Sequence, residues 1–430
     1  MSLRQAARAV FDAALQAADV HPLVQRALAG VRPAARGRVL VVGAGKASGA
    51  MAAAAESVLG DRIADGLVVV KDGYRAETRR IRLLEAGHPV PDARGEAAAR
   101  QIRALAESAA EDDLLLVLVS GGGSALTPAP APPITLADKQ AMTRLLLAAG
   151  ANINQLNAVR KHCSLLKGGQ LARAAAPARV HALLLSDVIG DPLDVIASGP
   201  TAPDASTFAE ARAILERFDL TRRAPAAVVE RLERGARGEI PETPKPEDPV
   251  FRLVTNTVIG NNLLVVEAAA ARARALGYAP HVLTRGLEGE AREVARTLVG
   301  LARQVQEGRG PVAAPACLIA GGETTVTVRG AGAGGRCQEW TLAAAIELDG
   351  VDGIVALAAG TDGTDGPTLA AGALADGDSA RRARELGQDP RARLAENDSN
   401  PVLAALGDLV VTGPTNTNLL DLYLVLVEGR

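Results

Sequence analysis

The chain has few cysteines, few aromatic residues and almost no net charge, and each shortage excludes a class of protein. Its three cysteines, Cys163, Cys317 and Cys337, are widely spaced and form no CxxC pair, which predicts reduced thiols in the cytoplasm rather than a zinc site or a disulfide framework. A net charge of −2 provides no basic field for nucleic acid, and no apolar run approaches the ~20 residues that span a membrane. Aromatic residues are only 2% of the chain, so its cores must consist of Ala, Leu and Val.

The length and the order of the apolar segments predict a two-domain α/β protein. A single core is seldom built from 430 residues. Short strand patterns alternate with helical patterns, which favours a doubly wound, mostly parallel sheet, followed by a second α/β domain with a mixed sheet. Residues 234–249 contain four prolines and many charges, so we place the boundary there, between domains 1–240 and 250–430. The alternative for this stretch is a long surface loop inside one domain.

The apolar periodicities assign most of the chain to helices or strands. Strands are predicted at 38–42, 66–70, 81–85, 114–119, 180–185, 250–255, 280–283, 317–320, 324–328 and 353–359. Helices are predicted at 3–18, 47–59, 92–108, 135–149, 154–175, 261–276, 288–306 and 336–347. The segments 409–411 and 420–427 are predicted to pair as a closing hairpin.

The stretch LLLVLVSGGGSAL, residues 114–126, is the strongest candidate for a ligand-binding loop. Six apolar residues read as a strand that is buried on both faces. They are followed by Ser120, Gly121, Gly122, Gly123 and Ser124. Residues without a Cβ let backbone amides approach an anion at the end of a strand, so this loop is predicted to bind phosphate. The alternative is a tight surface turn.

Lysine is scarce, and one of the six lysines, Lys46, follows a second glycine turn. It lies between Gly43-Ala44-Gly45 and a predicted helix, where the helix dipole and the ammonium group both favour a phosphate. The phosphate-loop pattern GxxxxGK[ST] fails, because Leu40 stands at its first glycine and Ala47 follows the lysine. The dinucleotide fingerprint GxGxxG fails at its third glycine, where Ser48 stands. The alternative role of Lys46 is that of a solvated capping residue.

Acidic residues follow several predicted strands. Asp187 and Asp191 follow the strand at 180–185, where two carboxylates suit Mg²⁺ or the acceptance of a proton from a substrate hydroxyl. The alternative is capping of the loop by Asx turns. Glu323 follows the strand at 317–320, and Asp362, with Asp365, follows the strand at 353–359, where an ordinary turn is the alternative.

Arg336 stands at a predicted helix start, where a cation opposes the helix dipole. This local cost suggests an anionic ligand, since arginine binds phosphate and carboxylate through two donors at once. His88 and His162 have no partner at an informative spacing, and we interpret both as structural.

Together these segments resemble the glycerate 2-kinase family with a C-terminal MOFRL domain. The resemblance extends over essentially the whole chain and rests on six motifs in order. They are VVGAGKASGAM (41–51), LVSGGGSAL (118–126), NQLNAVRKHCSLLKGG (154–169), LLLSDVIGDPLDVIASGPT (183–201), AGGETTVTVRGAGAGGRCQE (320–339) and AAGTDGTDGPT (358–368). Cys337 is a mild departure, because asparagine is common at that place in the family.

The resemblance implies a Rossmann-like first domain and transfer of a phosphoryl group from ATP to D-glycerate, with magnesium, to give 2-phosphoglycerate. It also implies that Lys46 and Arg336 are a catalytic pair. Asp187 is the third predicted catalytic residue. Asp187 and Asp191 are also the predicted metal ligands. The predicted substrate and phosphate contacts are Gly43, Gly45, Ser120, Gly121, Gly122, Gly123, Ser124, Asp191, Glu323 and Asp362.

Two other functions remain open at this point. The first is an NAD(P)-dependent hydroxypyruvate reductase, a name attached to similar sequences; the broken fingerprint and the lack of a His–carboxylate relay disfavour it. The second is a non-catalytic sensor of a sugar acid or a nucleotide, which the number of charged strand-end residues disfavours. The expected partners are small molecules, D-glycerate and ATP, without nucleic acid or membrane, and a homodimer remains open.

Overall fold

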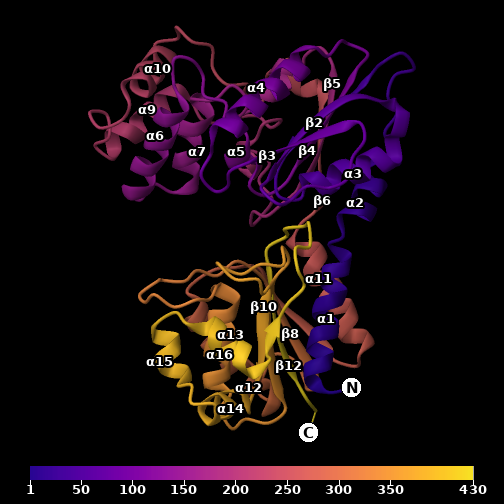
Figure 1. The fold of residues 1–430 in the computed structure, drawn as a ribbon, viewed down its shortest axis with the longest axis vertical. Coiled ribbons are helices and arrows are strands. Elements are labelled where there is room, and N and C mark those ends of the chain that lie inside the picture. Colours follow the sequence, from indigo (N-terminus) through magenta and orange to yellow (C-terminus); the bar gives the residue numbers. More distant parts are fainter. Residues whose placement is uncertain (430) are drawn as a thin grey trace. The chain divides into compact units, whose positions relative to one another are not determined.

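The computed structural model describes residues 1–429, which form two compact α/β units. The first unit is Val20–Ile259. The second unit combines Met1–Asp19 with the chain from Gly260 onward (Figure 1). The predicted fold class, two α/β domains, is confirmed.

The two units differ from the predicted ranges 1–240 and 250–430. Helix α1 (Leu3–Ala17) packs against α11 (Asn262–Ala275) and so belongs to the second unit. Strand β6 (Val254–Gly260) is the last strand of the first unit's sheet. The proline-rich stretch 234–249 is therefore a loop of the first unit, where Thr243 Oγ1 donates to Asp204 at 3.0 Å. Composition could not reveal this packing, because the partners lie far apart in the sequence.

The first unit contains a six-stranded sheet in the order β3-β2-β1-β4-β5-β6. Its strands are β1 (Val39–Ala44), β2 (Ile63–Lys71), β3 (Ile81–Ala86), β4 (Leu114–Val119), β5 (Arg179–Leu185) and β6. The pairs from β3 through β5 are parallel. The chain builds outward from β1 to β3 and then returns to add β4 on the other side of β1, so the sheet is doubly wound and its order reverses between β1 and β4.

Helices cover this sheet, and some of them form a separate cluster with a small core of its own. The helices of the first unit are α2 (Val20–Leu28), α3 (Ser48–Leu59), α4 (Ala93–Glu107), α5 (Gly123–Leu126), α6 (Leu136–Ala148), α7 (Ile153–His162), α8 (Gln170–Ala175), α9 (Phe208–Arg217) and α10 (Ala226–Ala236). Of these, α6, α7, α9 and α10 gather around Met142, Leu156 and Phe208 (Figure 1). The sequence analysis predicted no element at α9 or α10. In neither unit, as far as residue 429, is a helix both long and apolar enough to cross a bilayer.

The second unit contains a mixed sheet in the order β11-β10-β9-β12-β8-β7. Its strands are β7 (Ala279–Leu287), β8 (Ala316–Gly322), β9 (Ile354–Gly360), β10 (Gly372–Asp376), β11 (Leu409–Val410) and β12 (Asp421–Val427). Only the pair of β7 and β8 is parallel among the pairs of this described sheet. The helices, besides α1 and α11, are α12 (Ala291–Gln306), α13 (Arg336–Glu347), α14 (Ser379–Glu385), α15 (Pro390–Ala395) and α16 (Ser399–Leu406).

One predicted strand is absent, one predicted pairing of strands is wrong, and one strand begins later than predicted. Residues 324–328 form no strand and make only an isolated bridge between Thr325 and Glu290. The predicted hairpin does not form, because β11 pairs with β10 whereas β12 lies between β9 and β8. Residues 249–253 are a short helical turn, and the strand begins only at Val254. In each case the alternating or apolar pattern is present in the sequence. Contacts in the tertiary structure decide whether the segment becomes a strand and which strand it pairs with.

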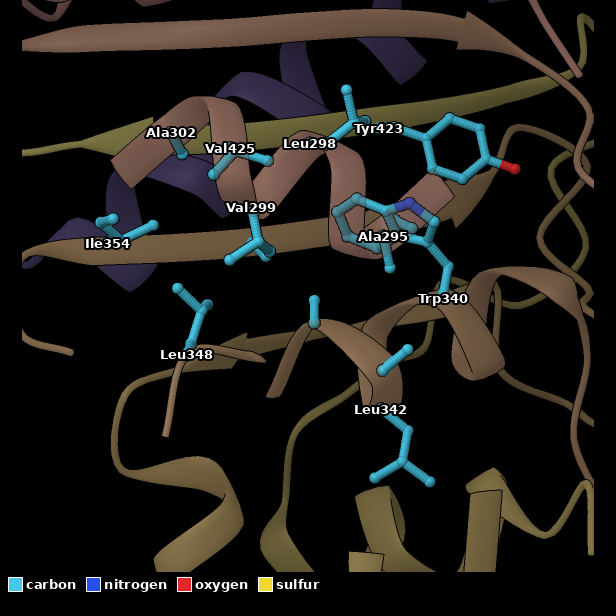
Figure 2. Packing of buried hydrophobic residues seen from close by; sticks show 14 of the residues in the cluster. Ala295, Leu298, Val299, Ala302, Trp340, Leu342, Leu348, Ile354, Tyr423 and Val425 are labelled. Atoms are coloured by element: carbon cyan, nitrogen blue, oxygen red, sulfur yellow. The ribbon is translucent and has the colours of Figure 1, made fainter. Parts of the chain in front are cut away.

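The core of the second unit contains the single tryptophan of the chain. Trp340 from α13 meets Tyr423 from β12 edge to face, with ring centroids 5.5 Å apart (Figure 2). Residues of α12, among them Leu298 and Val299, fill the space beside these rings. The Tyr423 hydroxyl donates to Asp421 Oδ2 at 3.1 Å, so this core ends at a buried carboxylate.

Because α1 packs in the second unit, a substitution in its buried face should destabilise that unit. Phe11 is 1% exposed in α1, so Phe11→Ala should cost about 3–5 kcal/mol of stability in the second unit. Because Trp340 is the only tryptophan, urea unfolding followed by its fluorescence reports on this unit alone. The exposed variant Arg8→Ala is the control and should shift the midpoint little. An unchanged Trp340 transition in Phe11→Ala would contradict the assignment of α1.

Candidate active site

The carboxyl edge of the first sheet is where a doubly wound fold binds ligands. The loops that follow β1 and β4 lie at the point where the strand order reverses, the place where such folds commonly bind a ligand. The first loop carries Gly45 and Lys46, and the second carries Ser120 and the three glycines that follow. The two glycine turns predicted from the sequence are therefore neighbours in space.

Hydrogen bonds hold the two loops directly together. The Lys46 amide donates to the Gly121 carbonyl oxygen at 2.9 Å, and the Ala47 amide donates to Ser120 Oγ at 3.0 Å. The Gly45 amide donates to the Val69 carbonyl oxygen at 3.1 Å. The amides of the first loop are thus occupied by protein acceptors.

Gly43 and Gly45 make this close approach possible. A Cβ on Gly43 would lie 2.2 Å from the Leu118 carbonyl oxygen, and one on Gly45 would lie 2.1 Å from Ser120 Oγ. Any side chain at either place would push the ends of β1 and β4 apart. Their structural role is therefore clear, whereas phosphate binding by Gly43 and Gly45 stays a prediction.

The second loop has amide donors to offer. Gly122 has a φ of +87°, in the left-handed region that glycine tolerates without strain. Within residues 1–429, neither the Gly121 nor the Gly122 amide donates to a protein acceptor. Two unpaired amides in a glycine turn at a strand end form the kind of nest that accepts an anion.

Lys46 and His88 lie beside this loop. A Cβ on Gly122 would lie 3.7 Å from Lys46 Cγ and 3.0 Å from the His88 ring. Burial, followed by the charges of Lys46 and Lys71, lowers the pKa of His88 to about 4, so its ring is neutral at pH 7. The sequence analysis treated His88 as structural, although its place just after β3, at the same edge of the sheet, was a signal for the site. His162 is a core residue, with Nδ1 2.7 Å from the Ala158 carbonyl oxygen.

Ser124 is fixed by a chain of polar contacts. Its Oγ lies 3.0 Å from Ser198 Oγ, which donates to Asn157 Oδ1 at 3.1 Å. Ala197 and Ser198 have φ values of +50° and +61°, a conformation that typically costs about 1–3 kcal/mol for a residue with a side chain. Such a conformation persists where the surrounding structure imposes it, and in this conformation Ser198 contacts Ser124.

Asp187 and Asp191 follow β5, the neighbour of β4, and so belong to the same edge of the sheet. Asp191 also has a positive φ, +54°. Among the described residues, no three His, Cys, Asp or Glu side chains group as a metal site would require. A magnesium ion at this edge would take one or two protein carboxylates and complete its shell with water or phosphate oxygens, as Mg²⁺ commonly does. The metal and catalytic roles of Asp187 and Asp191 stay predictions.

In the second unit, two acidic residues hold the guanidinium of Arg336. Nε and Nη2 donate to the two carboxylate oxygens of Asp421 at 2.5 and 2.8 Å, and Nη1 lies 2.7 Å from Glu323 Oε1. Burial alone would lower the pKa of Arg336, but the bonds to Asp421 raise it above its ordinary value. The structure thus brings the predicted Arg336 and Glu323 together and adds Asp421, which the sequence analysis missed. An aspartate that opens an otherwise apolar strand was the available signal.

The helix that Arg336 begins carries its own anion. Asp365 accepts from the Cys337 and Gln338 amides at 3.1 and 2.9 Å and so caps the N-terminus of α13. The argument that a cation at this helix start requires an external anion is therefore incomplete, because Asp421 and Asp365 supply negative charge. Asp362 lies near: a Cβ on Gly360 would be 3.2 Å from Asp421 Oδ1 and 3.5 Å from Asp362 Oδ1.

The chain is similar to known proteins over its whole length. The family described as "Domain of unknown function (DUF4147)" matches residues 6–233, and the "MOFRL family" matches residues 316–421. The D-glycerate 2-kinase of Thermotoga maritima is 43% identical over 91% of this chain and 91% of its own length. The chain belongs to the DUF4147–MOFRL family. This membership confirms the resemblance that the motifs indicated.

Members of the DUF4147–MOFRL family carry two kinds of name. A putative hydroxypyruvate reductase of Agrobacterium vitis is 46% identical over 99% of this chain and 95% of its own length. The crystal structure of the Thermotoga maritima glycerate kinase matches with a TM-score of 0.91 at 40% identity and covers 99% of both chains. The DUF4147 match contains Lys46 and both glycine loops, and the MOFRL match contains Arg336, Glu323, Asp362 and Asp421.

The cap of α13 generates a prediction of pH-dependent stability. Burial raises the pKa of Asp365 from 3.8 to about 6, against the opposing bond from Gln338. A carboxyl group whose pKa is raised on folding stabilises the fold most below its unfolded pKa, and this contribution is lost as the pH rises toward 6. At 1.36 kcal/mol per pKa unit, and with part of the effect lying below pH 4, the second unit should lose roughly 2 kcal/mol between pH 4 and pH 7 relative to Asp365→Asn. Urea unfolding followed by Trp340 fluorescence measures this difference, and parallel pH profiles would contradict it.

Proposed function

We infer that the chain is a glycerate 2-kinase, which transfers the terminal phosphoryl group of ATP to the 2-hydroxyl of D-glycerate. The observation that supports this most directly is the glycine loop after β4, with the unpaired Gly121 and Gly122 amides and the Lys46 side chain beside it, within residues 1–429. A preformed set of donors of this kind suits a phosphate group. The glycerate kinase names of relatives that share nearly the whole chain agree with this chemistry.

Phosphoryl transfer requires alignment of the reactants and neutralisation of negative charge more than covalent chemistry. In this proposal Lys46 and Arg336 neutralise the transferred group, and Gly121, Gly122 and Ser124 hold phosphate oxygens. Arg336 reaches this role already oriented, because Asp421 binds it through two oxygens. Asp187 accepts the proton of the attacking hydroxyl, whereas Asp191, Glu323 and Asp362 contact substrate.

Magnesium is proposed as the metal that accompanies ATP. The carboxylates of Asp187 and Asp191 would hold it, since oxygen ligands from one or two carboxylates are what Mg²⁺ takes from a protein. When bound, the ion offsets the charge of the phosphate oxygens.

We further propose a cytoplasmic enzyme that acts on small molecules; its three cysteines are buried and unpaired within the described chain, as expected for reduced thiols. A homodimer is compatible with this function.

The second candidate, a hydroxypyruvate reductase, is named by one group of relatives. A nicotinamide dinucleotide would place its pyrophosphate on the amides of the loop after β1. Here the amides of Gly45, Lys46 and Ala47 already donate to protein acceptors. The aspartate after β2, Asp72, is bound through two oxygens by Arg94 at 2.7 and 2.9 Å, so a ribose would compete with this guanidinium. Both observations disfavour the reductase.

The proposed reaction is tested by product identification. With ATP, magnesium and D-glycerate, the protein should give 2-phosphoglycerate, which phosphorus NMR distinguishes from 3-phosphoglycerate. In a parallel assay with hydroxypyruvate, the absorbance of NADH and of NADPH should stay constant. Oxidation of either nucleotide without any phosphorylated product would establish the reductase instead.

The two charged residues are tested by substitution. Lys46→Met should lower kcat about 10²- to 10³-fold, because a charge that stabilises the transferring group is removed. Arg336→Lys should lower kcat as well, because lysine keeps the charge and loses the two-point contact. The thermal midpoint shows whether each variant is folded, and Trp340 fluorescence adds a check for Arg336→Lys, which lies in the same unit as the tryptophan. The check matters for Arg336 because its removal leaves the buried Asp421 without its cation. Wild-type turnover in folded Lys46→Met would refute its role.

A further inference from the structure

Beside Gly122, the first unit contains a pocket of ≈ 440 Å³ whose charged lining is entirely basic. Lys139 and Arg144 come from α6, Arg160 comes from the last turn of α7, and His88 borders the opening of the glycine loop. No aspartate or glutamate is among the residues that line it. Gly122 and Ser124 belong both to this pocket and to the loop after β4.

Among the described residues 1–429, the basic groups of this pocket have no anionic partner. Lys139 is 9% exposed, and among residues 1–429 its ammonium makes no hydrogen bond or ion pair. The guanidinium of Arg160 likewise makes none within the described chain, and its Nε is buried without an acceptor. Burial, and then the charge of Arg160, lowers the pKa of Lys139 to about 8.

The neighbouring buried lysines, in contrast, have partners within the protein. Lys161, the residue after Arg160, lies 3.0 Å from Asp194 and 3.3 Å from Asp204. Lys167 donates to the Ser124 carbonyl oxygen at 2.9 Å. Since an unpaired buried charge is costly, the lack of a partner for Lys139 and Arg160 indicates that the compensating anion comes from a ligand.

We propose that this pocket binds the carboxylate of the acceptor acid through Lys139 and Arg160, with the exposed Arg144 at its entrance. The inference rests on the proposed glycerate kinase function and assigns the acid's place within it. An acid held there directs its hydroxyl groups toward Gly122 and Ser124, and so toward the loop that holds the phosphate. The carboxylate, rather than magnesium-bound ATP, is the ligand that this lining favours, because it offers no carboxylate to a metal and no aromatic ring except His88 to a base.

The test compares Arg160→Met and Lys139→Met with the wild-type protein. Each variant should raise the KM for D-glycerate about 10- to 100-fold, the range for loss of one charge-assisted hydrogen bond, and leave the KM for ATP within about twofold. Isothermal titration with D-glycerate, without nucleotide, should show the same loss of affinity. The matched control is Arg212→Met, an exposed arginine of α9 that pairs with Glu216 at 3.3 Å, and it should leave both KM values unchanged.

A second substrate separates the carboxylate from other contacts. Glyceramide has the same carbon chain but no charge, so the wild-type preference for D-glycerate over glyceramide should largely disappear in Arg160→Met and return in part in Arg160→Lys. If the KM for ATP rises instead and that for D-glycerate does not, the pocket holds nucleotide phosphates and the proposal is wrong. Unchanged KM values in folded, active variants would also overturn it. A wild-type protein that does not phosphorylate D-glycerate would refute the proposed function itself, which distinguishes the two failures.

Discussion

The close approach of two strand ends is the constraint on which the first unit's site depends. β1 and β4 are parallel neighbours at the point where the sheet reverses its order, and Gly43 and Gly45 leave no side chain between them. Ser120 fills this junction: it is fully buried and accepts the Ala47 amide at 3.0 Å. Because the loop after β1 uses its amides on these contacts, the loop after β4 is left with the donors that can face a ligand.

Two groups of buried charges, one in each unit, are compensated in different ways. In the second unit, Arg336 is bound by Asp421 and Glu323, and Asp365 caps the helix that Arg336 begins, so cation and anions compensate each other inside the protein. In the first unit, Lys139 and Arg160 lie in a pocket whose lining has no acidic residue. An internally paired guanidinium is rigid and oriented, whereas unpaired buried cations attract an anion from outside. Both arrangements suit a kinase of a small anionic acid. The paired Arg336 is oriented toward its role, and the unpaired Lys139 and Arg160 suit recognition of the acid.

Relatives with this fold are named as reductases or as kinases, and the local geometry of the first loop distinguishes between these two functions. The strand order β3-β2-β1-β4-β5-β6 is that of dinucleotide-binding proteins, so fold alone would admit a reductase. The occupied amides after β1 and the pairing of Asp72 with Arg94 are what distinguish this chain. Relatives carry both names, and the site of this chain favours the kinase.

Local sequence determined the features that depend on neighbouring residues. β4 occupies the predicted residues 114–119, because a run that is apolar on both faces suits a fully buried strand, and the glycine turns and Lys46 lie at the predicted strand ends. Only the tertiary structure decided that α1 joins the second unit, that β12 lies inside its sheet, that Asp421 binds Arg336, and that Lys139 and Arg160 share a pocket. These features join segments far apart in the chain, where burial and charge compensation, rather than periodicity, select the partner.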